Sequence, residues 1–155
     1  NMVRGVPPAL DLRAERALQD LVVSLGDGRL IRSAHDCADG GLAVTLAECC
    51  FGAAGIGAEA SIDELRVSKQ ADVNEAAVLF GESASRIVVS TSADDATKVL
   101  EQAAAAGVPA RVIGRTGGNL LRITVGGRTA IDVPVAEAER AWSTAIERFF
   151  GKRVA

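Results

Sequence analysis

The side chains best suited to chemistry lie in residues 35–41, which read His-Asp-Cys-Ala-Asp-Gly-Gly. The apolar run at 30–34 predicts a short buried strand before them, and the apolar spacing from residue 42 predicts a helix after them. Glycines at a strand-to-helix turn leave the N–H groups of the first helical turn open to an anion. The segment is therefore the first candidate for a ligand site.

Two acidic side chains, Asp36 and Asp39, limit what this turn would bind. Carboxylates repel a bare phosphate, so the turn suits either a phosphate bridged by Mg²⁺ or no ligand at all. In the second case Asp39 simply caps the helix, and local evidence favours the cap because aspartate precedes helices far more often than it binds metals.

The second candidate is the segment 81–86, Gly-Glu-Ser-Ala-Ser-Arg, between a predicted helix end and a predicted strand. Its carboxylate, hydroxyls and guanidinium suit a hydroxyl-rich or phosphorylated ligand. The alternative is a surface ion pair between Glu82 and Arg86, worth at most about 1 kcal/mol. The sequence offers no catalytic triad, because G-x-S-x-G is absent and a histidine at a strand end, such as His35, is more often structural.

Composition narrows the class of protein. At 155 residues, with 48% hydrophobic and 24% charged residues, the chain is expected to be one globular domain. A net charge of -3 and only 3% aromatic residues argue against nucleic acid as a partner. The sequence has no apolar run long enough to cross a bilayer, so no membrane partner is expected.

The three cysteines, Cys37, Cys49 and Cys50, indicate a reducing compartment. Adjacent cysteines on a helix diverge and do not easily bridge. All three thiols are therefore predicted to be reduced and at least partly buried.

Periodicity predicts an α/β (α+β) fold, with a mixed sheet flanked by helices and a partly ferredoxin-like order in the second half. Residues 1–10 are interpreted as a tag remnant, from Asn1 before Met2, and a linker, and residues 11–155 as the domain. In the last helix, Trp142 and Phe149 are expected in the core. The expected helices are 12–25 after Asp11, 42–53, 75–80 after Asn74, one opened by Ser92 and Asp95 and closed by Gly107, and 135–149 after Pro134. The expected strands are 30–34, 55–62, 87–90, 108–114, 120–125 and 129–133. A loop or short helix is expected over 63–73 and a hairpin turn at 126–127.

Taken together, HDCADGGLAVTLAECC (35–50) and LFGESASRIVVS (79–90) resemble the C-terminal domain of phosphoribosylformylglycinamidine synthases, relatives of aminoimidazole ribonucleotide synthetase. The opening PPALDL and the Asp-Val-Pro before a tryptophan-bearing helix resemble that family too, so the likeness covers nearly the whole chain. The resemblance implies the fold of the aminoimidazole ribonucleotide synthetase C-terminal domain. These synthases carry that domain twice, and this chain resembles the second copy.

The resemblance also implies a function in purine biosynthesis. Such a synthase is an ATP-dependent carbon–nitrogen ligase that converts formylglycinamide ribonucleotide, with glutamine or ammonia, to formylglycinamidine ribonucleotide. In the first copy the residue matching Asp36 helps to hold Mg²⁺, and the residues matching 82–84 contact the ribonucleotide. This chain has Ala38 and Ala84 where serine and glutamine are usual. The implied ligand-binding candidates are His35, Asp36, Asp39, Gly40, Gly41, Glu82, Ser83 and Arg86, with Asp36 as the metal candidate and no catalytic residue.

The implied cofactors are Mg²⁺ and ATP for the whole synthase, with neither held tightly by this chain. The implied partners are the remaining domains of the same chain, a glutaminase and small accessory subunits, in the cytoplasm. This chain alone is expected to be inactive and mainly scaffold and interface. The alternatives are a domain with its own nucleotide or metal site at Asp36 and Asp39, and a free-standing small-molecule-binding regulatory domain of ferredoxin-like type.

Overall fold

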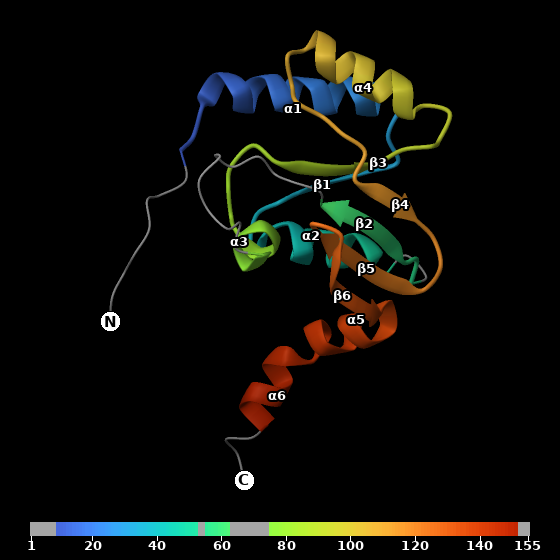
Figure 1. Cartoon of the computed structure of the whole chain (residues 1–155). Coiled ribbons are helices and arrows are strands. Elements are labelled where there is room, and N and C mark those ends of the chain that lie inside the picture. The colour runs from blue at the N-terminus through green and yellow to red at the C-terminus, as the bar shows by residue number, and fades with distance from the viewer. Residues whose placement is uncertain (1–8, 53–54, 63–74, 152–155) are drawn as a thin grey trace. The chain divides into compact units, whose positions relative to one another are not determined.

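A computed structural model describes residues 9–52, 55–62 and 75–151 (Figure 1). The described helices, together with strands in mixed pairing, confirm the predicted α/β class. The chain forms two compact units, one of residues 1–45 and 80–112 and the other of residues 46–79 and 113–155. The proposed tag remnant and most of the linker, the segment 63–73 and the Asn74 cap lie outside the described residues.

The first unit begins with helix α1 (Leu12–Asp27), which Asp11 caps as predicted. The Asp11 carboxylate accepts hydrogen bonds from the N–H groups of Arg13 (2.9 Å) and Ala14 (3.2 Å). These bonds satisfy donors in the first turn that have no partner within the helix. A local sequence signal therefore fixes where α1 starts.

Helix α4 (Ala96–Ala105) follows the predicted capping pair. The Ser92 hydroxyl donates to the Asp95 carboxylate (2.7 Å), and the Asp95 N–H donates to Ser92 Oγ (3.2 Å). The hydrogen bond from Ser92, with a second from Lys98, holds the pKa of the Asp95 carboxyl below its ordinary value. The pair thus confirms the expected start of this helix.

Helices α1 and α4 share a buried apolar cluster, which explains a difference from the predicted strand at 30–34. Strand β1 is Ser33–Asp36, and it is mostly exposed rather than buried. The two apolar residues before it pack on the helices instead of pairing in a sheet. The cluster consists of Leu21, Leu25, Val99 and Ala103, with Leu30, Ile31 and Val108 packed against it.

Strand β1 pairs antiparallel with β3 (Ile87–Ser90) in a two-stranded sheet. The register places Ser33 opposite Ser90 and Asp36 opposite Ile87, and the two serine hydroxyls lie 2.6 Å apart. Because the strands are antiparallel, the end of β1 lies beside the start of β3. The two segments singled out for their polar side chains therefore meet.

The second unit is built on a four-stranded sheet with the order β4-β2-β5-β6. Strands β2 and β5 are parallel and the other pairs are antiparallel, which confirms the predicted mixed sheet. Gly126 and Gly127, both with positive φ (55° and 73°), form the predicted β5–β6 hairpin turn. Strands β3 and β4, which flank α4, lie in different sheets. The strands are β2 (Ala58–Ile62), β4 (Gly114–Thr116), β5 (Leu120–Val125) and β6 (Arg128–Pro134).

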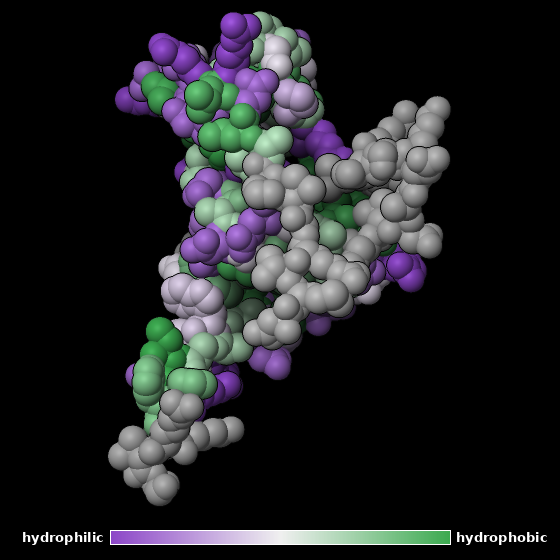
Figure 2. Space-filling model, turned by 90° about the vertical axis from the view of Figure 1, so that its left-hand side faces the viewer, coloured by the Kyte–Doolittle hydropathy of each residue, from purple (hydrophilic) through white to green (hydrophobic). Residues whose placement is uncertain are grey.

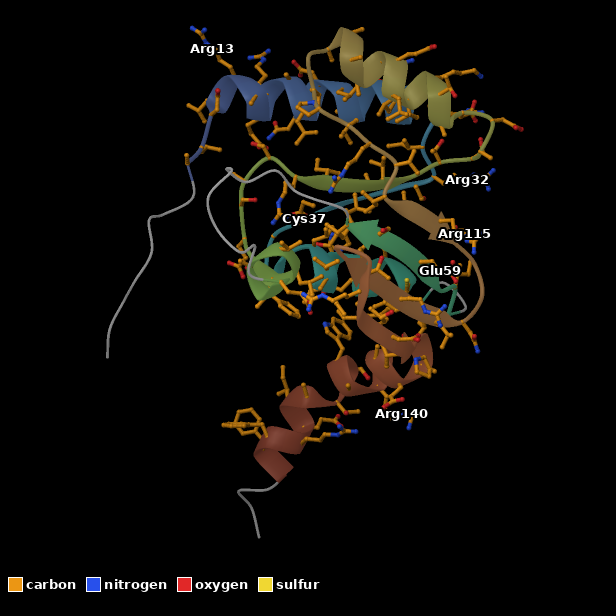
Figure 3. The ribbon with its side chains drawn as sticks, viewed as in Figure 1. Arg13, Arg32, Cys37, Glu59, Arg115 and Arg140 are labelled. Atoms are coloured by element: carbon orange, nitrogen blue, oxygen red, sulfur yellow. The ribbon has the colours of Figure 1, made fainter. Side chains whose placement is uncertain are left out.

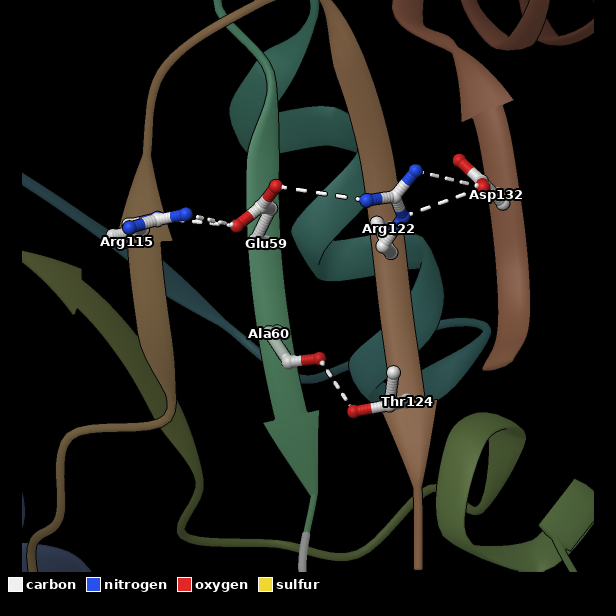
Figure 4. A network of polar contacts seen from close by, with 6 residues as sticks. All are labelled: Glu59, Ala60, Arg115, Arg122, Thr124 and Asp132. Carbon is white, nitrogen blue, oxygen red and sulfur yellow. Dashed lines mark hydrogen bonds and ion pairs between the residues drawn. The ribbon is translucent and has the colours of Figure 1, made fainter. Parts of the chain in front are cut away.

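One side of the central strands is buried and the other is charged. Ile62 and Ile123 are almost inaccessible to solvent. On the charged side four residues of alternating sign lie across the sheet, Arg115 and Glu59 among them (Figures 3 and 4). Arg115 Nη2 lies 2.7 Å from Glu59 Oε2, and Arg122 Nη2 lies 3.0 Å from Asp132 Oδ2. The hydrogen bond to Asp132 raises the pKa of Arg122. This alternation gives each strand a charged partner on its neighbour.

The predicted strand at 108–114 is mostly not a strand, since β4 begins only at Gly114. Val108 packs against the helical cluster of the first unit, and Pro109 has no N–H to donate to a ladder. Within this segment the Ile113 carbonyl accepts from the Ser61 N–H (2.7 Å). Sheet pairing therefore starts where the chain leaves the first unit.

The predicted last helix is divided into α5 (Val135–Ser143) and α6 (Ala145–Gly151). At the break, the N–H and the hydroxyl of Thr144 both donate to the Arg140 carbonyl (3.2 and 2.7 Å). A threonine hydroxyl that takes a backbone carbonyl competes with helix propagation. Trp142 and Phe149 are 58% and 60% exposed, so the prediction that they lie in the core is wrong for the described structure.

Helix α2 (Gly41–Cys50) confirms the helix predicted after the glycine turn, and α3 (Glu75–Phe80) has the predicted bounds. No disulfide joins the three cysteines, and Cys37 and Cys50 are buried, but Cys49 is exposed, so the prediction that all three thiols are at least partly buried is wrong for Cys49. Leu42, Leu46 and Cys50 repeat every four positions and share the buried face of α2. Cys49 comes one position before Cys50, so its side chain points away from that face. Burial raises the pKa of the Cys50 thiol.

The described residues include no helix long and apolar enough to cross a membrane.

Candidate functional site

The turn between β1 and α2 depends on two glycines. Gly40 and Gly41 have φ values of +79° and +66°, a region that side chains disfavour. A Cβ atom at Gly40 would lie 2.5 Å from Val44 Cγ2, which is closer than any normal contact. The turn therefore needs glycine at position 40 for its backbone conformation and for its packing.

Thr45 fixes the two ends of this turn. Its buried hydroxyl lies 3.1 Å from the Asp36 carbonyl and 3.0 Å from the Gly41 carbonyl and donates to both acceptors. Thr45 was not among the predicted site residues, although a lone hydroxyl on an otherwise apolar helix face is a detectable signal. This side chain joins the end of β1 to the first turn of α2.

The two predicted polar segments are joined by Glu82. Its Oε1 accepts a hydrogen bond of 2.9 Å from the Gly40 N–H, immediately before α2. A carboxylate is favourable there because helix N-termini attract negative charge. The carboxylate bonded to this N–H group is that of Glu82, whereas the predicted cap was Asp39. One N–H group beside the start of α2 is thus bonded to a side chain of the protein itself.

The segment 81–86 is held in place by its own polar groups. The Arg86 guanidinium donates to the Gly81 carbonyl and, through Nε, to the Ser83 carbonyl (3.5 Å), rather than to Glu82. The Arg86 carbonyl in turn accepts from the Cys37 N–H (2.9 Å). The Glu82–Arg86 ion pair, which the sequence left open as the alternative to a ligand site, is therefore replaced by two separate structural contacts.

Ser85 links the same segment to α1. Its φ of +61° is unusual for a residue with a side chain, and its hydroxyl donates to the Glu15 carboxylate at 2.6 Å. This bond, with a second from Gln19, lowers the pKa of the Glu15 carboxyl. The sequence pointed to the segment that contains Ser85 but not to Glu15 or to this contact, because no local pattern joins positions 70 apart.

His35 is placed by its neighbour. Its Nδ1 lies 2.8 Å from the Asp36 carbonyl oxygen and 3.7 Å from the Asp36 carboxylate. A ring nitrogen this close to a carbonyl oxygen is a donor when it carries its proton. The geometry agrees with the structural role that the sequence favoured for this histidine.

A shallow open hollow of about 510 Å³ lies over these segments, within the first unit. Its lining includes five of the eight predicted ligand-binding residues, while His35, Gly40 and Gly41 are not part of the lining. The lining contains four carboxylates and one guanidinium, and that guanidinium is bonded to backbone carbonyls. The charged lining residues are Glu15, Asp36, Asp39, Glu82 and Arg86, with Ser83 and Ser85 supplying hydroxyls.

This lining does not fit a nucleotide triphosphate or a complete magnesium site. Phosphates need cations and free donors around them, and the hollow presents an excess of negative charge. Among the residues that the structure describes, no group of three or more His, Cys, Asp or Glu side chains is arranged to hold a metal ion. Asp36 as a magnesium ligand stays a prediction, because one or two carboxylates can hold Mg²⁺ together with phosphate and water.

Ser85→Ala is expected to raise the pKa of Glu15 towards its ordinary value of 4.5, because the largest cause of its depression is the Ser85 hydrogen bond. A lowered folded-state pKa stabilises the protein above the unfolded-state pKa, and this stabilisation is lost as pH falls through the folded-state value. The variant should thus lose less stability on acidification. NMR titration of the Glu15 carboxyl measures the shift. Ser83→Ala is the control, and an unchanged Glu15 pKa in Ser85→Ala would contradict the assignment.

The fold and the paired turns define the class of protein. The sequence matches the family described as AIR synthase related protein, C-terminal domain, over residues 2–126, and the chain belongs to that family. The phosphoribosylformylglycinamidine synthase subunit PurL of Moorella thermoacetica is 41% identical over 145 residues, which are 94% of this chain and 19% of the subunit. The same subunit of Anaeromyxobacter sp. strain Fw109-5 is 42% identical over 140 residues, 89% of this chain and 18% of the subunit.

Solved structures show the same fold. Thermotoga maritima PurL complexed with ATP superposes with a TM-score of 0.75 at 23% identity, covering 87% of this chain and 23% of that one. T. maritima PurL complexed with FGAR gives 0.74 at 24% identity, covering 85% and 22%. This chain therefore spans about a fifth of the length of the curated relatives that it matches.

Proposed function

We propose that this chain is the C-terminal AIR-synthase-related part of a phosphoribosylformylglycinamidine synthase subunit, and that it serves there as scaffold and domain interface. The reaction of the whole subunit is the ATP-dependent conversion of formylglycinamide ribonucleotide to formylglycinamidine ribonucleotide, with glutamine or ammonia as the nitrogen source. The observation that carries the proposal is the likeness to PurL subunits, at about 41% identity over nearly the whole chain.

The acidic hollow supports a structural role for the two polar segments. The Gly40 N–H group donates to Glu82, and the Arg86 guanidinium donates to a backbone carbonyl. Neither this N–H group nor the guanidinium is therefore available to a phosphate. We assign the chemistry to groups outside this chain, since phosphoryl transfer needs cations around the transferred group. The residues that remain proposed ligand contacts, in this second copy of the domain, are His35, Asp36, Asp39, Gly40, Gly41, Glu82, Ser83 and Arg86.

The proposed setting is a multidomain enzyme in the cytoplasm that uses Mg²⁺ with ATP. Its partners are the other domains of the same subunit, a glutaminase and small accessory subunits. A T. maritima assembly named PurLQS, whose fold matches with a TM-score of 0.71, supports accessory subunits for this class. A free-standing regulatory domain is disfavoured, because in the curated relatives a segment like this is about a fifth of the chain.

A chimeric subunit tests the assignment. When this chain replaces the matching 145-residue segment of the Moorella subunit, the chimera is expected to form formylglycinamidine ribonucleotide from ATP, ammonia and substrate. The subunit with that segment deleted is the control and is expected to be inactive. A folded chimera without turnover would contradict the assignment.

The isolated 155-residue chain is expected to show no ligation and no calorimetric binding of Mg·ATP, because its hollow lacks free cations. The scaffold role would be wrong if the chain bound Mg·ATP at micromolar concentration and Asp36→Asn abolished that binding. In that case the domain would carry its own nucleotide site.

A further inference from the structure

The C-terminal helices expose a continuous apolar face. Four large side chains of α5 and α6 are 58–73% exposed, and Figure 2 shows apolar surface at the height of α6. They follow the spacing i, i+4, i+7 and i+8. Helical backbone hydrogen bonds continue through the break, from the Thr144 N–H to Arg140 and from the Arg148 N–H to Thr144, so this spacing places the four residues on one side of the two helices. We call this surface the C-terminal apolar face; it consists of Trp142, Ile146, Phe149 and Phe150.

This face is attached to the rest of the second unit at one end. The Trp142 ring lies 5.7 Å from the Phe51 ring, and the Gly52 N–H donates to Glu139 at 3.2 Å. Further along, Phe149 and Phe150 contact each other edge to face, with ring centroids 5.5 Å apart. The helix is thus anchored at its start and presents aromatic side chains beyond the anchor.

The area of the C-terminal apolar face distinguishes between two occupants, a second copy of this chain and another domain of the same chain. Three aromatic side chains, each about 60% exposed, together with Ile146 at 73%, offer roughly 350–550 Å². Two copies paired through this face would bury roughly 700–1,100 Å², which is below the about 1,200 Å² of stable interfaces between separate proteins. The same area suits an interface between domains of one chain, because the connection removes most of the entropy cost of association.

The charge beside the face and the length of the matched relatives also favour another domain of the same chain. The neighbouring Glu147 and Arg148 have opposite signs, so the face has no net charge that would select a membrane or a nucleic acid. The family match ends at residue 126, while the match to the Moorella subunit extends over 145 residues of a chain about five times longer. These helices therefore lie beyond the matched family domain, in chains that contain many other residues to cover them.

We propose that the C-terminal apolar face docks against another domain of the same synthase chain, in an apolar groove of that domain. This inference rests on the proposed function. It adds to it the specific surface by which this segment holds its neighbour.

Hydroxyl-radical footprinting with mass spectrometry tests the docking, because it reports the accessibility of individual aromatic side chains. We compare the isolated chain with the Moorella chimera described above. Trp142, Phe149 and Phe150 are expected to be oxidised at least several-fold more slowly in the chimera. Leu12, which is 73% exposed on α1, is the reference for general shielding and is expected to change less.

A variant separates docking from general shielding. Phe149→Ser in the chimera is expected to restore the oxidation of Trp142, whereas Leu12→Ser should leave it protected; far-UV circular dichroism checks folding in both. Equal oxidation of the face in the chimera and the isolated chain would overturn the proposal. Protection in the isolated chain that rises with its own concentration would overturn it in favour of a second copy.

The two proposals fail in different ways. An active chimera whose apolar face stays fully oxidisable contradicts the docking and leaves the assignment intact. A folded but inactive chimera whose apolar face is protected contradicts the assignment and supports the docking.

Discussion

Gly40→Val is expected to lower the free energy of unfolding of the first unit by about 2–4 kcal/mol. Two costs combine, because the backbone of Gly40 has a φ of +79° and an added Cβ would lie 2.5 Å from Val44 Cγ2. Denaturant unfolding followed by circular dichroism measures the change in midpoint. The same variant should disturb the hydrogen bond from the Gly40 N–H to Glu82, which amide hydrogen exchange would report.

Two other glycines provide matched controls for this prediction. Gly52 has a similar φ of +68° but open space around it, so Gly52→Val isolates the backbone strain. Gly26 lies inside α1 with open space and no positive φ, and Gly26→Ala should stabilise the helix by about 0.5–1 kcal/mol. If Gly40→Val and Gly52→Val had equal effects, the contact with Val44 would carry no cost.

Ile123→Ala is expected to lower the free energy of unfolding of the second unit by about 2–5 kcal/mol. Ile123 has no exposed surface and lies on β5, which pairs with β2 on one side and β6 on the other. The deletion removes apolar contacts and leaves a cavity that two paired neighbours prevent from closing. The measurement is the denaturant midpoint of the Trp142 fluorescence transition, supported by circular dichroism.

The matched control is Ile56→Ala, the same substitution at a side chain that is 49% exposed. It should change the free energy by no more than about 0.5 kcal/mol. Ile123→Val should fall between the two, at about 0.5–1.5 kcal/mol. Similar losses at positions 56 and 123 would show that burial in the sheet does not determine the cost.

Elements with local chemical signals were predictable from the sequence. Asp11 and the Ser92–Asp95 pair mark helix starts because the capping bonds join residues at most three apart. The Gly126–Gly127 turn specifies a hairpin because both positions need positive φ. Such features depend on few residues, so a single sequence contains all the information that they need.

Features that depend on distant contacts were less predictable. The sequence identified Gly40 and Glu82 separately, but their hydrogen bond depends on the pairing of β1 with β3. The residues before β1 are as apolar as a buried strand, and only the packing of α1 on α4 shows that they serve the helices. The exposure of Trp142 likewise follows from tertiary placement, because its helical spacing is that of a core residue.

The division of the chain into two interleaved units has a consequence for the order of folding. Strands β2 and β5 pair in parallel although residues 80–112, which belong to the first unit, lie between them in sequence. During synthesis the ribosome must therefore release most of the chain before the central pair of this sheet can form. The β5–β6 hairpin closes a short loop and can form early, whereas the β2–β5 pairing closes a loop of about sixty residues and should limit the rate. No single cut yields either unit as a continuous polypeptide.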